Sequence, residues 1–162
     1  MSVYRLSREV RRVTCVHEAG HAVLHALSGA FIYRMAVAPE GASDWTTTGR
    51  KGDAMADLWG VCEPSGSPGL GFVHCDAEDL RLVADRTAFA AMLQLMEANA
   101  KGAMREGYRQ IRAHVCGAMA GPVAEQIFKG EEPDHAEVEW VQFDDRMRAE
   151  ALCLLLPWRT RA

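Results

Sequence analysis

Apolar residues recur at helical spacing near the start of the chain. They stand at Val10, Val13, Val16, Val23, Leu24 and Leu27. Positions that return every three or four residues fall on one side of a helix. Ser7 is a residue type that caps the beginning of a helix, and Gly29 is a type that stops one. The pattern therefore predicts a helix over residues 7–28.

The pattern after this helix favours strands separated by a long irregular segment. Residues 31–38, FIYRMAVA, are strand formers with partial alternation, and Pro39 ends the run. Residues 71–75, GFVHC, predict a second short strand. Residues 39–70 hold much of the glycine, serine, proline and threonine. They predict an irregular insertion with a short helical turn at 53–59, and a loop of this length is often functional.

The rest of the chain reads as helical. Residues 77 to about 129 keep helical spacing, with a break expected near Lys101 and Gly102. A final helix is expected to begin near Asp144 and to end before Pro157, because the residue before a proline disfavours helix. These elements predict an α+β, mostly α-helical fold with a small two- or three-stranded sheet. We expect one domain over residues 1–162.

Composition narrows the class of protein. The 162 residues carry 18 basic and 22 acidic side chains, a formal net charge of -4, which argues against a nucleic-acid-binding protein. No apolar run approaches the roughly 20 residues that span a bilayer. The opening MSVYRLSREVRR lacks the apolar core of an export signal, and the five cysteines form no CxxC pair. We therefore expect no membrane span, reduced thiols and a cytoplasmic location.

Residues 17–21, His-Glu-Ala-Gly-His, carry the candidate chemistry. Helix positions four apart lie on one face, so His17 and His21 can converge on one zinc ion. Zinc lowers the pKa of a bound water to about 7. Glu18 is placed to take the proton of that water and to pass it toward the leaving amine. The pattern predicts a zinc cofactor and a catalytic Glu18.

A catalytic zinc needs a third protein ligand and an open position. The metzincin extension would require histidine at position 27, where the chain has Leu27. His25 continues the four-residue ladder but would lie about 12 Å along the helix axis from His17. The third ligand must therefore come from another segment, for which His74, His114 and Asp134 are among the candidates.

Three segments resemble the FtsH-type zinc peptidase domain. TCVHEAGHAVLHALSGAFIYRMAVAPEG is similar to the opening of that domain, and CGAMAGPVAEQIFKGEE is similar to a later helix. FDDRMRAEAL is similar to the segment whose aspartate is the third zinc ligand. The likeness covers roughly residues 10–40 and 113–152, and residues 41–110 match poorly. It implies a zincin-like helical domain that hydrolyses peptide bonds.

The register of this resemblance implies Asp145, and not Asp144, as the third ligand. On a helix, Asp145 would share a face with Ala149 and Leu152. A carboxylate directed at an apolar core needs a partner, and zinc is one. A helix-end charge favoured by the helix dipole is the alternative. The predicted metal set is His17, His21 and Asp145.

The resemblance also sets expectations about partners. The chain has no GxxxxGK[ST] phosphate loop, so we expect a peptidase domain without ATP-driven unfolding and a polypeptide substrate that is flexible or already unfolded. The hexameric rings of the family favour a homo-oligomer. In such folds an edge strand beside the zinc pairs with an extended peptide. Gly71–His74 is the candidate, with an ordinary edge strand as the alternative.

Other functions remain open for this sequence. The motif also suits a regulatory zinc protease that cleaves a repressor. The chain could instead be a non-catalytic zinc-binding or interaction module derived from a peptidase, or a structural zinc domain with four protein ligands. Glu18 argues against the last two, because a structural site needs no general base.

Overall fold

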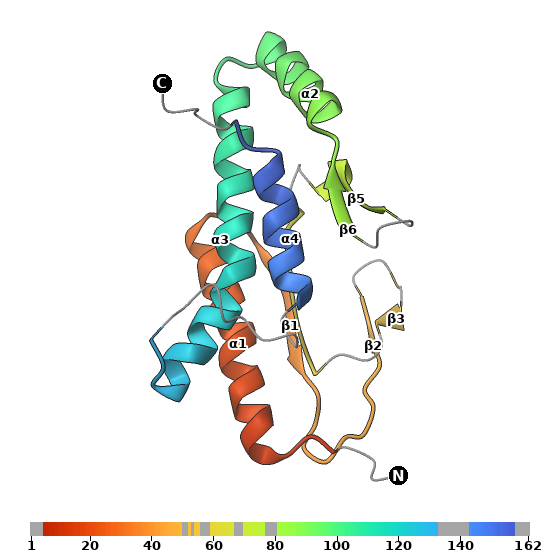
Figure 1. Ribbon diagram of the computed structural model, residues 1–162, viewed down its shortest axis with the longest axis vertical. Helices are drawn as coiled ribbons and strands as arrows, with labels where there is room; N and C mark the ends of the chain where they lie inside the picture. Colours follow the sequence, from red (N-terminus) through yellow and green to blue (C-terminus); the bar gives the residue numbers. More distant parts are fainter. Residues whose placement is uncertain are drawn as a thin grey trace. The chain divides into compact units, whose positions relative to one another are not determined.

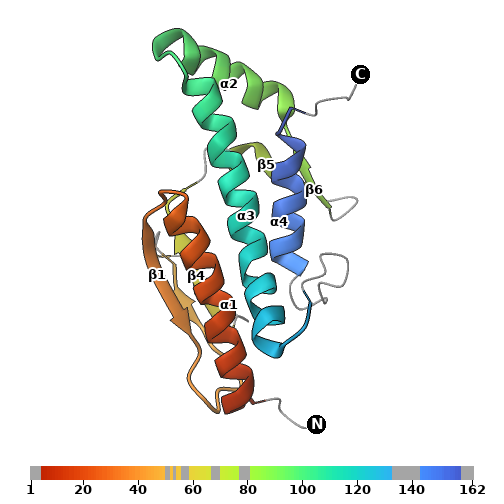
Figure 2. The same ribbon diagram turned by 90° about the vertical axis from the view of Figure 1, so that its left-hand side faces the viewer.

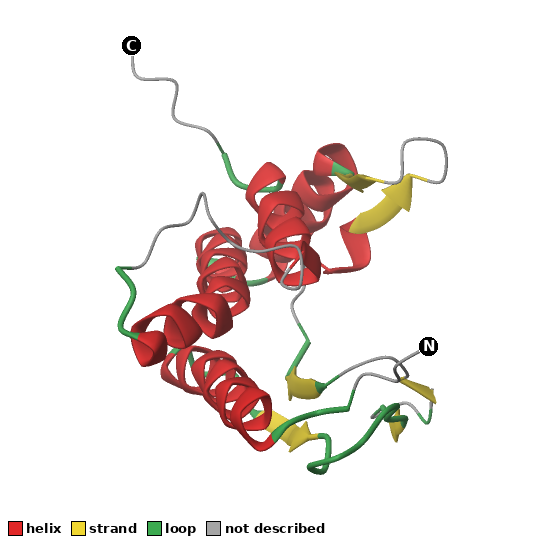
Figure 3. Cartoon of the chain, turned by 60° about the horizontal axis from the view of Figure 1, so that its bottom comes forward, coloured by secondary structure: helices red, strands yellow, loops and turns green. Residues whose placement is uncertain are grey.

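The computed structural model describes residues 5–49, 52, 54–55, 59–66, 70–76, 81–132 and 143–157 (Figure 1). Its elements are, in order, α1 (Arg8–Leu27), β1 (Ile32–Val37), β2 (Thr47–Thr48), β3 (Ala54–Met55), β4 (Gly60–Pro64), η1 (Leu70–Phe72), β5 (Val73–Asp76), β6 (Arg81–Ala84), α2 (Arg86–Asn99), α3 (Ala103–Lys129) and α4 (Phe143–Leu154). Helices dominate and the strands are short (Figure 3). The described strands form two-stranded antiparallel sheets, which confirms the α+β, mostly α-helical prediction.

The chain divides into two compact units. One consists of residues 1–65 and 120–137, and the other of residues 66–119 and 138–162. Helix α3 passes from the second unit into the first between Met119 and Ala120. The single domain expected from the sequence stays a prediction.

Helix α1 of the first unit has the ends that the sequence predicts. The Ser7 hydroxyl accepts a hydrogen bond from the backbone N–H of Val10 at 3.2 Å, which caps the start. The helix ends at Leu27, and Gly29 follows with a φ of 85°, a conformation that glycine adopts without a steric penalty. The predicted strand follows as β1 and ends two residues before Pro39.

A two-stranded sheet packs on α1. Strands β1 and β4 are antiparallel, with Met35 opposite Cys62 and Val37 opposite Gly60. Both strands contact α1 (Figure 2). The sheet therefore lies directly against the helix that carries the histidine motif.

The segment 39–70 differs from its prediction. Ala54 and Met55 are part of β3, paired with β2, where the sequence suggested a helical turn. The Arg34 guanidinium of β1 explains why, because it donates to Thr47 Oγ1 at 2.9 Å and to the Thr48 carbonyl of β2. The same guanidinium pairs with Glu63 of β4 at 3.0 Å. Contacts with residues distant in sequence thus favour extended backbone in a segment with no strong pattern of its own.

The second unit has an apolar core between helices. Its fully buried members are Phe89, Leu93, Ile111, Leu152 and Leu155. Residues 81–84 form β6, paired with β5, where the sequence predicted that the helix had already begun. Asp85 caps the actual start of α2 by accepting from the Ala88 N–H at 2.9 Å.

The other predicted boundaries of the second unit are confirmed. The break between α2 and α3 falls at Lys101 and Gly102, and Gly102 has a φ of 90°. The Glu97 carboxylate accepts the backbone N–H groups of Gly102 and Met104, each at 2.9 Å, and so caps the start of α3. Helix α4 ends at Leu154, before Pro157. Among the described residues, no helix is both long and apolar enough to cross a membrane.

Candidate metal centre

The two histidines of the motif point their rings at one another from α1. Their Nε2 atoms lie 3.0 Å apart, and the ring centroids are 4.7 Å apart in an edge-on arrangement. Two nitrogen ligands of a tetrahedral zinc, each about 2.0–2.1 Å from the metal, lie about 3.3 Å from each other. The separation of the Nε2 atoms of His17 and His21 therefore fits a shared zinc ion.

Helix α3 supplies a carboxylate behind His17. Glu125 Oε2 lies 3.3 Å from His17 Nδ1, and the two side chains are 16% and 13% exposed. A protonated Nδ1 donating to Glu125 leaves the lone pair on Nε2, the atom that faces His21. The Glu125 side chain therefore favours the tautomer that a metal ligand needs.

Small residues let α1 and α3 approach closely within the first unit. A Cβ on Gly20 of α1 would lie 2.5 Å from the Ala120 carbonyl oxygen and 2.8 Å from the Ala124 Cβ. The cost of about 1 kcal/mol for glycine inside a helix is thus offset by packing against the α3 backbone. The motif's Gly20 serves helix packing.

A second glycine leaves room for the histidine rings. Gly121 lies on α3, and a Cβ there would lie 2.6 Å from His21 Cε1 and 2.8 Å from His17 Nε2. Real Cβ atoms essentially never approach other atoms so closely. The position of both rings therefore requires glycine at residue 121.

Glu18 is buried against the start of β4. Only 7% of this residue is exposed. A Cβ on Gly60 would lie 2.7 Å from Glu18 Cγ and 2.8 Å from Thr14 Cγ2. The strand beside the candidate base is thus β4. The sequence favoured Gly71–His74 for this place, and that expectation stays a prediction.

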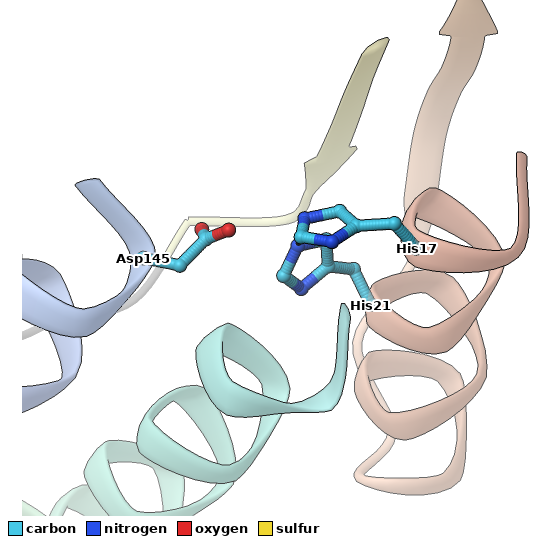
Figure 4. Close-up of side chains that lie close together, drawn as sticks. All are labelled: His17, His21 and Asp145. Atoms are coloured by element: carbon cyan, nitrogen blue, oxygen red, sulfur yellow. The ribbon is translucent and has the colours of Figure 1, made fainter. Parts of the chain in front are cut away.

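Asp145 lies in the first turn of α4, on the face that the sequence predicted. Ala149 and Leu152, one and two turns later, are 4% and 0% exposed. Figure 4 draws the side chains of His17 and His21, which belong to the first unit, and of Asp145, which belongs to the second. Such a set of side chains could hold a metal ion. Asp144 is also helical, but its side chain lies outside what the structure describes.

The other candidate ligands are not in this group. His25 is buried on α1, His74 is exposed on β5, and neither belongs to the described set of metal-ligating side chains. Burial, followed by the nearby Arg148 cation, lowers the pKa of His114. Asp134 lies outside the described residues.

The sequence predicted the histidines, Glu18 and Asp145 as site residues, and it gave no sign of the two glycines, Gly60 and Gly121, that lie against Glu18 and the histidine rings. Gly121 lies within a run of helical spacing, and nothing in that run distinguishes it. A glycine that makes space for a distant side chain carries no periodic signal. Gly60 lies in the segment without a recognisable pattern, so nothing in the sequence marked it as a neighbour of Glu18.

Known proteins add no further guide to the site. The chain matches no model of a known protein family, no curated protein and no solved structure.

Proposed function

We propose that this protein is a zinc-dependent metallopeptidase in which Glu18 is the general base. One observation carries the proposal: the Nε2 atoms of His17 and His21 lie 3.0 Å apart, and a buried carboxylate adjoins the first histidine in the chain. A carboxylate next to a zinc-binding histidine on a helix is the group expected to take the proton of a metal-bound water. The spacing of the two nitrogens suits zinc, and Asp145 is the proposed third ligand.

The chemistry follows from where these groups stand. Zinc, when bound, acidifies a water molecule and polarises the scissile carbonyl. Glu18 takes a proton from the attacking water and delivers it to the leaving nitrogen as the C–N bond breaks.

We place the substrate peptide along β4. The start of this strand adjoins Glu18 at Gly60, and among the described strands β4 pairs with β1 alone. An extended peptide that pairs with a strand is held by backbone hydrogen bonds, with little demand on its sequence. Gly71–His74, the strand that the sequence favoured, is the alternative.

The wider proposal is an FtsH-like endopeptidase domain. Its support is the likeness of three sequence segments to that family, together with a mostly helical fold that carries the histidine motif on its first helix. We further propose a cytoplasmic location, unfolded polypeptides as substrates and self-association into a homo-oligomer.

Metal analysis combined with a cleavage assay tests the proposal. Purified protein should contain about one zinc per chain and should cleave an unfolded polypeptide. A chelator should abolish the cleavage, and added zinc should restore it. Zinc without any cleavage would favour a non-catalytic zinc-binding module. Protein that neither retains nor takes up zinc would overturn the proposal.

A further inference from the structure

Glu125 joins the histidine site to a cation on the surface of α3. Its Oε2 lies 3.3 Å from His17 Nδ1, while its Oε1 lies 2.7 Å from Lys129 Nζ. The exposed fraction rises from 13% for His17 to 37% for Lys129. The two carboxylate oxygens thus connect a largely buried ring with a partly exposed ammonium group.

The two contacts of Glu125 differ in strength. The 2.7 Å contact with Lys129 is a short ion pair between residues one turn apart on the same helix. The 3.3 Å contact with the His17 ring is longer and hence weaker. The ion pair therefore holds the carboxylate in one rotamer, and the carboxylate in that rotamer sets the rotation of the ring.

Ring rotation matters because a metal accepts the Nε2 lone pair in one direction only. An acceptor on Nδ1 fixes that direction, and removal of such acceptors in metalloproteins weakens metal binding about 10- to 100-fold. A glutamate side chain without its own anchor would lose rotamer entropy on making this contact. The ion pair with Lys129 already restricts the Glu125 side chain, so less rotamer entropy remains to be lost when Glu125 contacts His17.

We propose that Glu125 is a positioning residue for the metal centre and that Lys129 holds Glu125 in place. Both residues would then raise zinc affinity although neither touches the metal. This inference rests on the proposed zinc site at His17 and His21. It assigns a role to a lysine that the histidine motif does not include.

The direction in which zinc affinity changes when Lys129 is removed distinguishes positioning of Glu125 from a purely electrostatic effect. A cation near the site repels zinc, so its removal would strengthen zinc binding if charge alone acted. If Lys129 works by positioning Glu125, its removal should weaken zinc binding. Lys129→Met is therefore the decisive variant.

The experiment measures the zinc dissociation constant by competition with a chromophoric chelator. We expect Glu125→Ala to weaken binding about 10- to 100-fold. Lys129→Met should weaken it by a smaller factor, and Lys129→Arg should restore it. The double variant Glu125→Ala, Lys129→Met should bind no more weakly than Glu125→Ala, because the lysine acts through the glutamate.

Matched controls remove a similar charge elsewhere in the chain. Lys101→Met deletes an exposed lysine, and Glu106→Gln deletes an α3 carboxylate paired with Arg109 at 2.6 Å. Both should leave the zinc affinity unchanged. Circular dichroism of the metal-free forms reports folding separately. If Glu125→Ala does not fold, Glu125→Gln takes its place. The glutamine keeps an oxygen acceptor for His17 but weakens the contact with Lys129. Its zinc affinity should lie between the affinities of wild type and Lys129→Met, or equal that of Lys129→Met.

Three outcomes would overturn the inference in distinguishable ways. Wild-type affinity in both folded single variants would remove the positioning role and leave the zinc peptidase proposal standing. Tighter binding by Lys129→Met, or strictly additive losses in the double variant, would show that Lys129 does not act through Glu125. A wild-type protein without measurable zinc binding would overturn the proposed function itself.

Discussion

Gly121 of α3 lies against the His21 ring so closely that a Cβ at residue 121 would be 2.6 Å from His21 Cε1. The same Cβ would be 2.8 Å from His17 Nε2, the other predicted metal-binding nitrogen. Both rings belong to α1, whereas Gly121 belongs to α3. Residue 121 therefore limits the positions that the two histidine rings can take. A substitution at Gly121 therefore tests the metal site without changing any proposed ligand.

Gly121→Ala should keep most of the helical fold but lose most of the bound zinc. The added methyl group must push at least one ring away, and two displaced imidazoles no longer converge on one ion. Gly66→Ala is the matched control, since a Cβ at Gly66 meets nothing within 4 Å. Zinc content at equal helicity by circular dichroism is the measurement. Full zinc in Gly121→Ala would contradict the site geometry.

Glu18→Gln should retain zinc and lose peptide hydrolysis. A positioned general base contributes roughly 10²- to 10⁴-fold, and glutamine is nearly isosteric but cannot accept the proton. Because Glu18 is only 7% exposed, the neutral amide should not lower the stability of the fold much. The turnover of an unfolded polypeptide and the zinc content are measured on the same sample. Unchanged turnover would show that another group is the base.

Asp145→Ala should lose most of the zinc and activity, whereas Asp144→Ala should keep both. Two imidazoles alone do not complete a three-ligand site. Loss of the negative charge of Asp144 in the first turn of α4 would lower stability by at most about 1 kcal/mol. Helix α4 should remain folded in both variants because Leu152 and Leu155 are buried. Metal loss in Asp144→Ala alone would show that the neighbouring carboxylate is the ligand.

His114 should make the metal-free protein less stable as the pH falls below about 6.5, the usual pKa of histidine. Burial and the Arg148 cation lower its pKa in the folded state, so the unfolded chain takes up the proton first. The contribution of neutral His114 to stability is therefore fully present above its pKa in the unfolded chain. It is lost as the pH falls toward its lower pKa in the folded protein.

Urea unfolding of the metal-free protein at several pH values measures this effect. His114→Gln should reduce the loss of stability that occurs as the pH falls below about 6.5, the ordinary pKa of histidine. Arg148→Met, which removes one of the two causes, should reduce it in part. An identical pH dependence in wild type and His114→Gln would rule out the contribution of this residue.

Local sequence patterns were sufficient to predict the elements that depend only on residues close together in the chain. The spacing of apolar residues, the Ser7 cap and Gly29 were sufficient for α1, and proline positions were sufficient for the ends of β1 and α4. The motif placed His17 and His21 on one helix face because a helix brings every fourth residue into line. These features depend on backbone geometry alone.

The third ligand needed more than periodicity. The stripe of Asp145, Ala149 and Leu152 predicted which aspartate faces the core, and burial of Ala149 and Leu152 confirms that face. Periodicity could not show which distant segment completes the metal set. That expectation came from a resemblance, and its role as a ligand stays a prediction.

The tertiary structure alone decided the surroundings of the motif. Strand β4 pairs with β1, and β2 pairs with β3, between residues far apart in sequence. The same holds for the close approach of Gly60 to Glu18 and of Gly121 to the histidine rings. Sheet formation in residues 39–70 depends on partners such as Arg34, because a short segment without strong propensity adopts the conformation that its neighbours stabilise. The space for a side chain exists only where two segments meet. It therefore follows from packing and has no signature along the chain.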